Sequence, residues 1–270
     1  MEEVWRNLKR IIVCLKQAID VSQLKVDPST RQPLIASAPR KMSDFDKNAL
    51  EEATRIKEKV GGFEVVTLTV TSEDVKPVLR EALAMGADKA FVASDASFKD
   101  VDTLGTAYAL SEAIRRIGEF DLILCGESSL DSFSGLVGAR LGELLSLPEI
   151  TAVRKLTVEG EMVMAERALE DSIESVRAKL PVLVAVTREI NQPRIPSLMM
   201  IMKASKKEIV TWTSADLGLQ KDKLISKIEI IEVVAPKTER KKIRITGESM
   251  EEIADKLARA LIQEGVVVKR

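Results

Sequence analysis

The sequence predicts an α/β fold, in which an open, mostly parallel sheet is covered by helices on both faces. Short apolar runs rich in Val, Ile and Leu alternate along the chain with longer segments that repeat apolar residues at helical spacing. Continuous apolar runs are typical of strands buried on both faces, and their alternation with helices is typical of parallel sheets. With 270 residues, of which 45% are hydrophobic, the chain is long enough for one large core.

The order of these elements follows directly from the pattern. Five buried strands are expected, at residues 11–15, 64–70, 90–93, 122–125 and 182–186. Four helices are expected, at residues 46–59, 72–85, 104–117 and 136–145. The first seven elements therefore have the order βαβαβαβ.

The helix ends carry recognisable capping residues. Expected starts lie at Ser43 and Asp44, at Thr71 and Ser72 with Glu73 and Asp74 in the opening turn, and at Asp102 and Thr103. Gly86 is expected to end the second helix, because glycine adopts the left-handed conformation that commonly closes helices.

The pattern changes after the fourth helix. Residues 156–165 alternate around a turn at Glu159 and Gly160, which predicts an antiparallel hairpin at the edge of the sheet. We expect residues 1–206 to form the α/β domain and residues 207–270 to form an arm. The arm would hold short strands at 210–238, a basic patch at 237–242, and a last amphipathic helix from Glu248 with a stop at Gly265.

The composition excludes several functional classes. The 41 basic and 42 acidic residues leave a formal charge of −1, which gives no general attraction to nucleic acid or to an anionic membrane. The absence of histidine excludes Ser-His, Cys-His and His-metal chemistry within this polypeptide, and no metal site is expected. Cys14 and Cys125 lie in apolar runs, as small buried side chains do. The apolar run near the N-terminus is too short for a signal peptide or a membrane span, so a cytoplasmic protein is expected.

A candidate ligand site follows the fourth strand, in the sequence ILCGESSLDSFSGLVGARLGELL. A strand that ends at Gly126 and leads through a Ser-rich loop into a helix leaves free backbone N–H groups, which suit phosphate oxygens. In open α/β sheets ligands bind at the carboxyl ends of strands, so the exit of the first strand at residues 14–16 is expected beside this loop. An ordinary strand-to-helix turn remains the alternative interpretation.

The segment at residues 190–209, INQPRIPSLMMIMKASKKEI, is apolar and basic at once. Pro193 and Pro196 exclude a central strand or an uninterrupted helix through Arg194. Five consecutive apolar residues then follow at 198–202, more than one face of a short element can bury. We expect a surface segment that contacts a partner, and the alternative is a loop and helix start packed on their own domain.

These segments together resemble the β subunit of electron transfer flavoproteins, of the FixA type. The resemblance rests on VCLKQAID, KMSDFDKNALEEATRIKE, REALAMGADKAF and the block from ILCGESSLD to MKASKKEI. Its most specific part is AERALEDSIESVRAKLPVLVA at residues 165–185. The resemblance implies an adenine nucleotide α-hydrolase-like, Rossmann-like fold and a heterodimer with an α subunit that carries the redox FAD.

The resemblance also implies which residues contact the nucleotide. These are Cys14, Ser43, Asp44, Phe45, Asp46, Val70, Gly126, Glu127, Ser128, Ser129, Leu130, Asp131, Ser132, Phe133, Ser134, Gly135, Leu136 and Val137. Relatives commonly carry an acidic residue and a Gln where this chain has Phe133 and Leu136, so backbone contacts are expected there. In the segment at 190–206, which corresponds to the family's recognition loop, Leu198 matches the anchor leucine. The expected partner-binding residues are Arg194, Leu198, Met199 and Lys203, and Lys206 and Lys207 would add positive charge.

Two versions of the function follow from this resemblance. In the first, the β subunit holds FAD and takes part in electron bifurcation, in which NADH supplies electrons to a ferredoxin-like protein and to the α-subunit FAD. Those electrons would continue to an acyl-CoA or other dehydrogenase, or to a quinone oxidoreductase. In the second, it holds a structural AMP. The long C-terminal tail and the sequence DFDKNALEEA favour FAD. A non-redox ATP- or AMP-binding sensor module is the alternative from another class.

Overall fold

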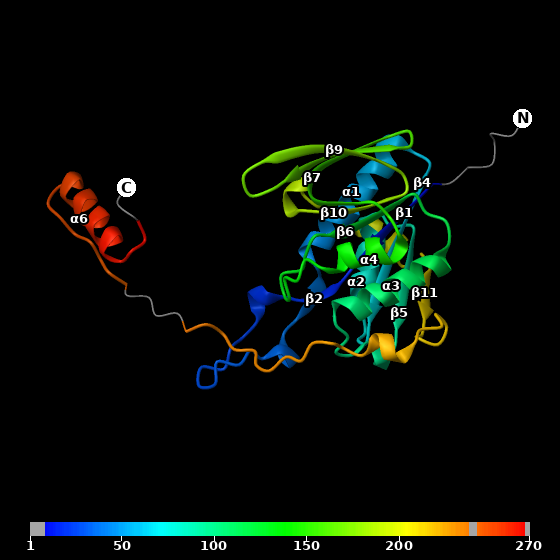
Figure 1. The fold of residues 1–270 in the computed structure, drawn as a ribbon, viewed down its shortest axis with the longest axis horizontal. Coiled ribbons are helices and arrows are strands. Elements are labelled where there is room, and N and C mark those ends of the chain that lie inside the picture. Colours follow the sequence, from blue (N-terminus) through cyan, green and yellow to red (C-terminus); the bar gives the residue numbers. More distant parts are fainter. Residues whose placement is uncertain (1–8, 238–241, 268–270) are drawn as a thin grey trace, which may run out of the picture. The chain divides into compact units, whose positions relative to one another are not determined.

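The computed structural model describes residues 9–237 and 242–267 of the chain. Contacts between Cα atoms divide the chain into two compact units, Met1–Val233 and Val234–Arg270. Figure 1 shows the course of the chain through both units.

Nine strands of the described residues form one sheet in the first unit, in the order β11-β5-β4-β1-β6-β10-β7-β8-β9. The central strands are β1 Lys9–Cys14, β4 Phe63–Thr71, β5 Lys89–Ser94, β6 Leu122–Gly126 and β10 Val182–Val186, and all their pairings are parallel. One edge is β11 Ile209–Trp212, which pairs in parallel with β5. The other side adds β7 Glu149–Glu159, β8 Met162–Ala168 and β9 Ile173–Lys179.

Helices cover both faces of this sheet. Ile11 and Val13 of β1 lie in one core cluster with residues of α1 Asp44–Val60 and α2 Lys76–Met85, and α5 Leu198–Ala204 contributes Ala204 to it. Ile12 and Cys14 point to the opposite face, where they share a cluster with residues of α3 Thr103–Ile117 and α4 Val137–Leu145. The alternation along one buried strand is the period of two expected for a sheet covered on both sides.

The predicted α/β class and the order βαβαβαβ are confirmed (Figure 1). The prediction for α2 was wrong at its start, because the helix begins at Lys76 and not at Ser72. Pro77 lies in the first helical turn, where a missing N–H costs nothing. Upstream of it, Thr71 Oγ1 accepts a hydrogen bond from the amide of Glu73, and Asp74 Oδ1 accepts one from the amide of Lys76. These local bonds form turns in place of a helical turn.

The edge hairpin is confirmed, and it is longer than predicted. β7 pairs in parallel with β10 and antiparallel with β8, and β8 pairs antiparallel with β9. A second small hairpin, β2 Gln17–Ile19 with β3 Arg40–Met42, lies between β1 and α1 and was not predicted. The described residues also contain the short 3₁₀ helices η1 Val21–Gln23, η2 Ile35–Ser37, η3 Ala96–Phe98, η4 Arg188–Ile190 and η5 Lys221–Leu224.

The second unit contains helix α6 Met250–Gln263. The side chain of Ser249 accepts a hydrogen bond from the amide of Glu252 and caps its start, and none of its residues is buried. The expected division after residue 206 differs from the one after Val233, because β11 joins the sheet and belongs to the first unit. Most of the basic patch at 237–242 lies outside the described residues.

No described helix is long and apolar enough to cross a membrane. The described residues hold no group of three or more Asp, Glu or Cys side chains that could bind a metal ion.

Candidate functional site

The strand order reverses between β1 and β6. From β1 the chain moves to β4 and then to β5 on one side, and it returns to β6 on the other side of β1. In open α/β sheets, ligands bind at such a point, outside the carboxyl ends of the strands. The segments that leave those ends are residues 15–16 after β1 and the loop at 127–136 after β6.

Asp46, in the first turn of α1, joins these two strand ends. Its Oδ2 accepts a hydrogen bond from the amide of Lys16 at 2.8 Å, and its Oδ1 accepts one from the amide of Gly126 at 3.0 Å. Burial raises the pKa of Asp46 to about 7, against these two hydrogen bonds, which lower it. One buried carboxyl group therefore fixes the start of α1 against both β1 and β6.

The side chain of Lys16 fastens the loop to the same place. Its Nζ lies 2.7 Å from Asp131 Oδ1 and 3.2 Å from the hydroxyl oxygens of Ser129 and Ser132. Asp131 Oδ2 also accepts a hydrogen bond from the amide of Ile19 at 3.2 Å. The loop after β6 is thus held beside the exit of β1, as the sequence predicted. Lys16 was expected at this strand exit, but it was not among the residues predicted to contact the nucleotide.

Gly126 needs to be glycine because the start of α1 approaches its backbone closely. A Cβ at this position would lie 2.4 Å from the Cβ of Phe45 and 2.6 Å from Asp46 Oδ1. Real Cβ atoms do not approach other atoms so closely, and a larger residue would push α1 away from β6. The close approach keeps the main chain of β6 and the first turn of α1 in direct contact.

Two hydroxyl groups where β1, α1 and the loop after β6 meet have no hydrogen-bond partner of normal geometry. Ser43 precedes α1 and is buried, yet its side chain does not cap the helix. Its Oγ makes no hydrogen bond of normal geometry but lies close enough to the Asp46 carboxyl group to lower the pKa of that group, and the Oγ of Ser128 is unpartnered. Helix α4 follows the loop and also begins without a side-chain cap, at Leu136. Buried polar groups are normally satisfied, so unpartnered hydroxyls beside two uncapped helix starts mark a place for a ligand with acceptor oxygens.

The remaining predicted residues lie at or after the ends of the same elements and differ in burial. Cys14 ends β1 and is buried, and burial raises the pKa of its thiol to about 12. Val70 lies near the carboxyl end of β4, the strand next to β1. Phe45 is buried, and its ring meets that of exposed Phe133 edge-on, with centroids 6.3 Å apart. The other exposed loop residues are Ser132, Ser134, Gly135 and Leu136, whereas Asp44, Glu127, Leu130 and Val137 are partly exposed.

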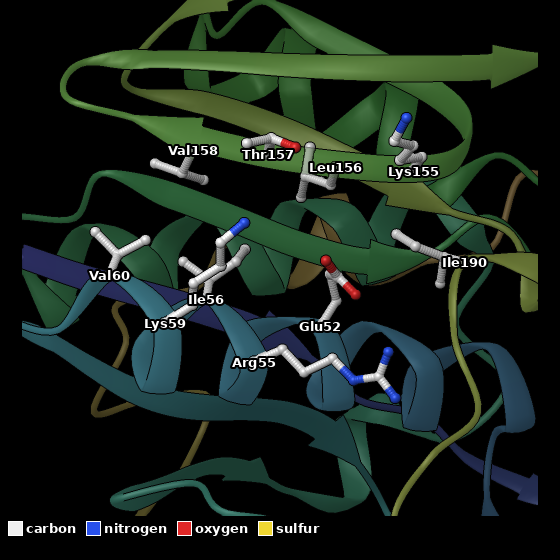
Figure 2. A pocket seen from close by; sticks show the side chains of 10 residues that line it. All are labelled: Glu52, Arg55, Ile56, Lys59, Val60, Lys155, Leu156, Thr157, Val158 and Ile190. Carbon is white, nitrogen blue, oxygen red and sulfur yellow. The ribbon is translucent and has the colours of Figure 1, made fainter.

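Two pockets in the described structure lie away from the junction of β1, α1 and β6. One, of about 220 Å³, lies between α1 and β7. Figure 2 shows Glu52 and Arg55 of α1 below Lys155 and Leu156 of β7. The other, of about 420 Å³, lies between residues 97–100 and 221–226. None of the residues predicted to bind the nucleotide lines either pocket.

The segment at 190–206 presents apolar side chains to solvent. Leu198 is 75% exposed, and Ile195, Met199, Ile201 and Met202 are exposed as well, so the alternative of a packed helix start does not apply to them. Lys203 and Lys206 are also exposed. Arg194 and Lys207 differ, because their charged groups bind other parts of this chain.

Comparison with known proteins identifies the family of this chain. The protein-family model of the electron transfer flavoprotein domain matches residues 34–217 of this chain. This range includes α1, the loop after β6 and the segment at 190–206. This match, together with the α/β fold, shows a protein of the electron transfer flavoprotein family. The chain belongs to this family, and within it to the β subunits.

Three relatives illustrate the likeness. The chain is 40% identical to an electron transfer flavoprotein subunit beta of Thermoanaerobacterium thermosaccharolyticum, over 92% of this chain and 96% of the relative. It is 32% identical to the caffeyl-CoA reductase-Etf complex subunit CarD of Acetobacterium woodii, over 96% of this chain and 100% of that subunit. It is also 37% identical to the subunit beta of Megasphaera elsdenii, over 74% of this chain and 76% of the relative.

Proposed function

We propose that this chain is the β subunit of a heterodimeric electron transfer flavoprotein that holds FAD in the crevice between β1 and β6 and takes part in electron bifurcation. The observation that carries the FAD version is the match to subunit CarD over 96% of this chain, which includes the long C-terminal region. That relative, by its name, belongs to a complex that combines a CoA-ester reductase with an electron transfer flavoprotein.

The residues at the crevice suit the adenylate part of such a cofactor. The uncapped start of α1 at Ser43, the free hydroxyl of Ser128 and the backbone of the loop at 127–136 would bind phosphate oxygens and sugar hydroxyls. When bound, FAD would supply the two-electron redox chemistry that takes electrons from NADH and divides them between a ferredoxin-like protein and the α-subunit FAD. This chain would bind and orient the cofactor, and no side chain here is proposed as a catalytic acid or base.

Further partners follow from the same proposal. The α subunit would be the permanent partner, and the arm with helix α6, whose residues are all at least partly exposed, would pack on it. The exposed apolar residues of α5 would contact an acyl-CoA or other dehydrogenase, or a quinone oxidoreductase, in a short-lived complex. We place this activity in the cytoplasm.

The alternative within the family is a β subunit that holds AMP, with all electrons carried by the α-subunit FAD. The same donors at Ser43 and in the loop suit AMP, because the adenylate part is common to both molecules. The non-redox sensor module is disfavoured, since the family match extends through the segment at 190–206.

The experiment that separates these versions is an analysis of released cofactors. The chain is co-expressed with its α subunit, the purified heterodimer is denatured, and FAD and AMP are quantified by chromatography. The proposal predicts two FAD and no AMP per heterodimer. One FAD with one AMP would replace it by the structural-AMP version, and a colourless heterodimer without flavin would reject the electron-carrier function.

A further inference from the structure

Arg194 is held by two acidic residues of α1. Its Nε lies 2.7 Å from Glu51 Oε2, and its two terminal nitrogens lie 2.6 and 2.9 Å from the carboxylate oxygens of Glu58. The Glu51 side chain is only 3% exposed, and it also accepts a hydrogen bond from the amide of Arg194. A planar guanidinium group that binds two carboxylates in this way is fixed in orientation.

Asn191 strengthens the same attachment. The Asn48 side chain donates hydrogen bonds to the Asn191 carbonyl oxygen at 2.7 Å and to its Oδ1 at 3.0 Å. In return, Asn191 Nδ2 donates to the Asn48 carbonyl oxygen at 3.0 Å and to Glu52 Oε2 at 2.9 Å. Asn48 is buried, so these bonds are shielded from water.

The other end of the segment is attached to α2. Arg80 donates hydrogen bonds to the carbonyl oxygens of Ala204 and Ser205 at the end of α5, at 2.9 and 3.1 Å. Lys207 Nζ donates to the carbonyl oxygens of Leu83 and Ala87 at the end of α2, at 3.0 and 2.5 Å. Cations at helix ends satisfy carbonyl groups that lack partners within the helix.

Between these two attachments lie the exposed apolar residues of α5. We propose that Arg194 is a positioning residue, which with Glu51 and Glu58 fixes the segment at 191–207 so that α5 is presented to the partner in its binding conformation. This inference rests on the proposed docking function of α5. It differs from the expectation that Arg194 binds the partner, because its charge is already matched by two carboxylates of its own chain.

A fixed segment matters because a loop that becomes ordered only on binding loses conformational freedom at that step. Loosening the attachment should therefore weaken docking without altering the electron-transfer step. In kinetic terms, the KM for the partner rises while kcat stays the same. The cofactor content of the heterodimer should not change.

The test uses the complete heterodimer, reduced chemically, and an acyl-CoA dehydrogenase as the electron acceptor. Glu58→Gln removes one carboxylate charge at a half-exposed site and leaves the buried Glu51 in place, so the variant should fold. Glu51→Gln changes a side chain that is too buried to touch a partner. We expect each variant to raise the KM for the dehydrogenase several-fold, and the double variant to raise it about tenfold, with kcat unchanged. Arg194→Lys keeps the positive charge and should raise the KM less than Arg194→Gln does.

A second readout follows the segment directly. A spin label on Met202→Cys reports the mobility of α5, and the buried thiols of Cys14 and Cys125 should not react with the label. We expect the label to be more mobile when Glu58→Gln or Glu51→Gln is added than in the labelled protein that carries Met202→Cys alone. Lys203→Gln is the matched control, because Lys203 is exposed, and it should alter the salt dependence of docking but not the mobility.

Unchanged KM and unchanged mobility in the double variant would overturn the positioning role. Leu198→Ala, measured in the same assay, then separates two cases. If it raises the KM, α5 still docks and only the inference about Arg194 fails. If it has no effect either, the docking function proposed for α5 fails as well.

Discussion

The carboxyl group of Asp46 accepts a hydrogen bond from the amide of Gly126 at 3.0 Å, although 80 residues separate them in the sequence. This bond fixes the first turn of α1 to the carboxyl end of β6. With the second bond from the amide of Lys16, it brings together the three segments that form the crevice. The predictions about the nucleotide site depend on this junction.

Replacing Gly126 by alanine should damage the junction. The new methyl group would lie 2.4 Å from the Cβ of Phe45, so α1 must move, at a cost of about 1–3 kcal/mol in the free energy of unfolding. Thermal unfolding and nucleotide retention should both decrease. Gly142→Ala in α4 is the control, because its Cβ would make only ordinary contacts, the nearest at 3.6 Å, and alanine favours helices by about 1 kcal/mol. Equal effects of the two substitutions would contradict this account.

The stability of the protein should carry a pH dependence that comes from Asp46. Its pKa is raised to about 7 by burial, whereas an unfolded chain has a value of about 4. Between these values the folded state binds more protons, so Asp46 makes stability fall as pH rises from 4 to 7, by at most about 1.4 kcal/mol per unit. Above pH 7 the contribution should level off. Urea unfolding of the unchanged protein and of Asp46→Asn from pH 4 to pH 7 measures this contribution. A free energy of unfolding that varies with pH in the same way in both proteins would refute it.

Ser43→Ala should separate stability from ligand binding. The Ser43 hydroxyl makes no hydrogen bond of normal geometry, although it lies close enough to the Asp46 carboxyl group to lower its pKa, so its removal should change the free energy of unfolding by less than about 0.5 kcal/mol. If Ser43 binds the nucleotide, affinity should fall by about 0.5–1.5 kcal/mol, roughly two- to twelvefold. Thr67→Val is the matched control, since Thr67 is also buried and unpartnered but lies within β4. Titration calorimetry should find weaker binding in Ser43→Ala alone.

Leu198→Ala should affect docking and little else. The side chain is 75% exposed, so the free energy of unfolding should change by less than about 0.5 kcal/mol. Burial of a leucine at an interface contributes about 1.5–3 kcal/mol, which predicts a KM for the dehydrogenase roughly ten- to a hundredfold higher. Val60→Ala, at the exposed end of α1, should leave the KM unchanged. A normal KM in Leu198→Ala would show that α5 is not the docking surface.

The sequence predicted the central sheet well because its strands are continuous apolar runs. The strand β10 has the predicted bounds, and β1 and β6 differ from prediction by one or two residues. The third strand of the edge hairpin, β9, was missed because it is largely exposed and carries charged residues. The start of α2 was misplaced because Ser72, Glu73 and Asp74 suit turns as well as helix starts.

The candidate site was predicted in part. Local sequence indicates that a Gly- and Ser-containing loop follows β6 and that it should meet the exit of β1. It does not indicate that Lys16 binds Asp131, which lies 115 positions away, or that Glu51 binds Arg194, which lies 143 positions away. The expected partner-binding role of Arg194 followed from its basic charge and from its place in the segment that resembles the family's recognition loop. Only the folded chain shows that the carboxylates of Glu51 and Glu58 form ion pairs with the guanidinium group of Arg194.

The central claim is that a nucleotide binds at the junction of β1, α1 and β6. A crystal structure of the purified heterodimer with its native cofactor tests this most directly. We predict that the adenylate part lies between Ser43–Asp46 and the loop at 127–136, with the backbone amides and the hydroxyls of Ser43 and Ser128 on its oxygen atoms. A nucleotide bound elsewhere on this subunit, with this crevice closed by packed side chains, would contradict the claim.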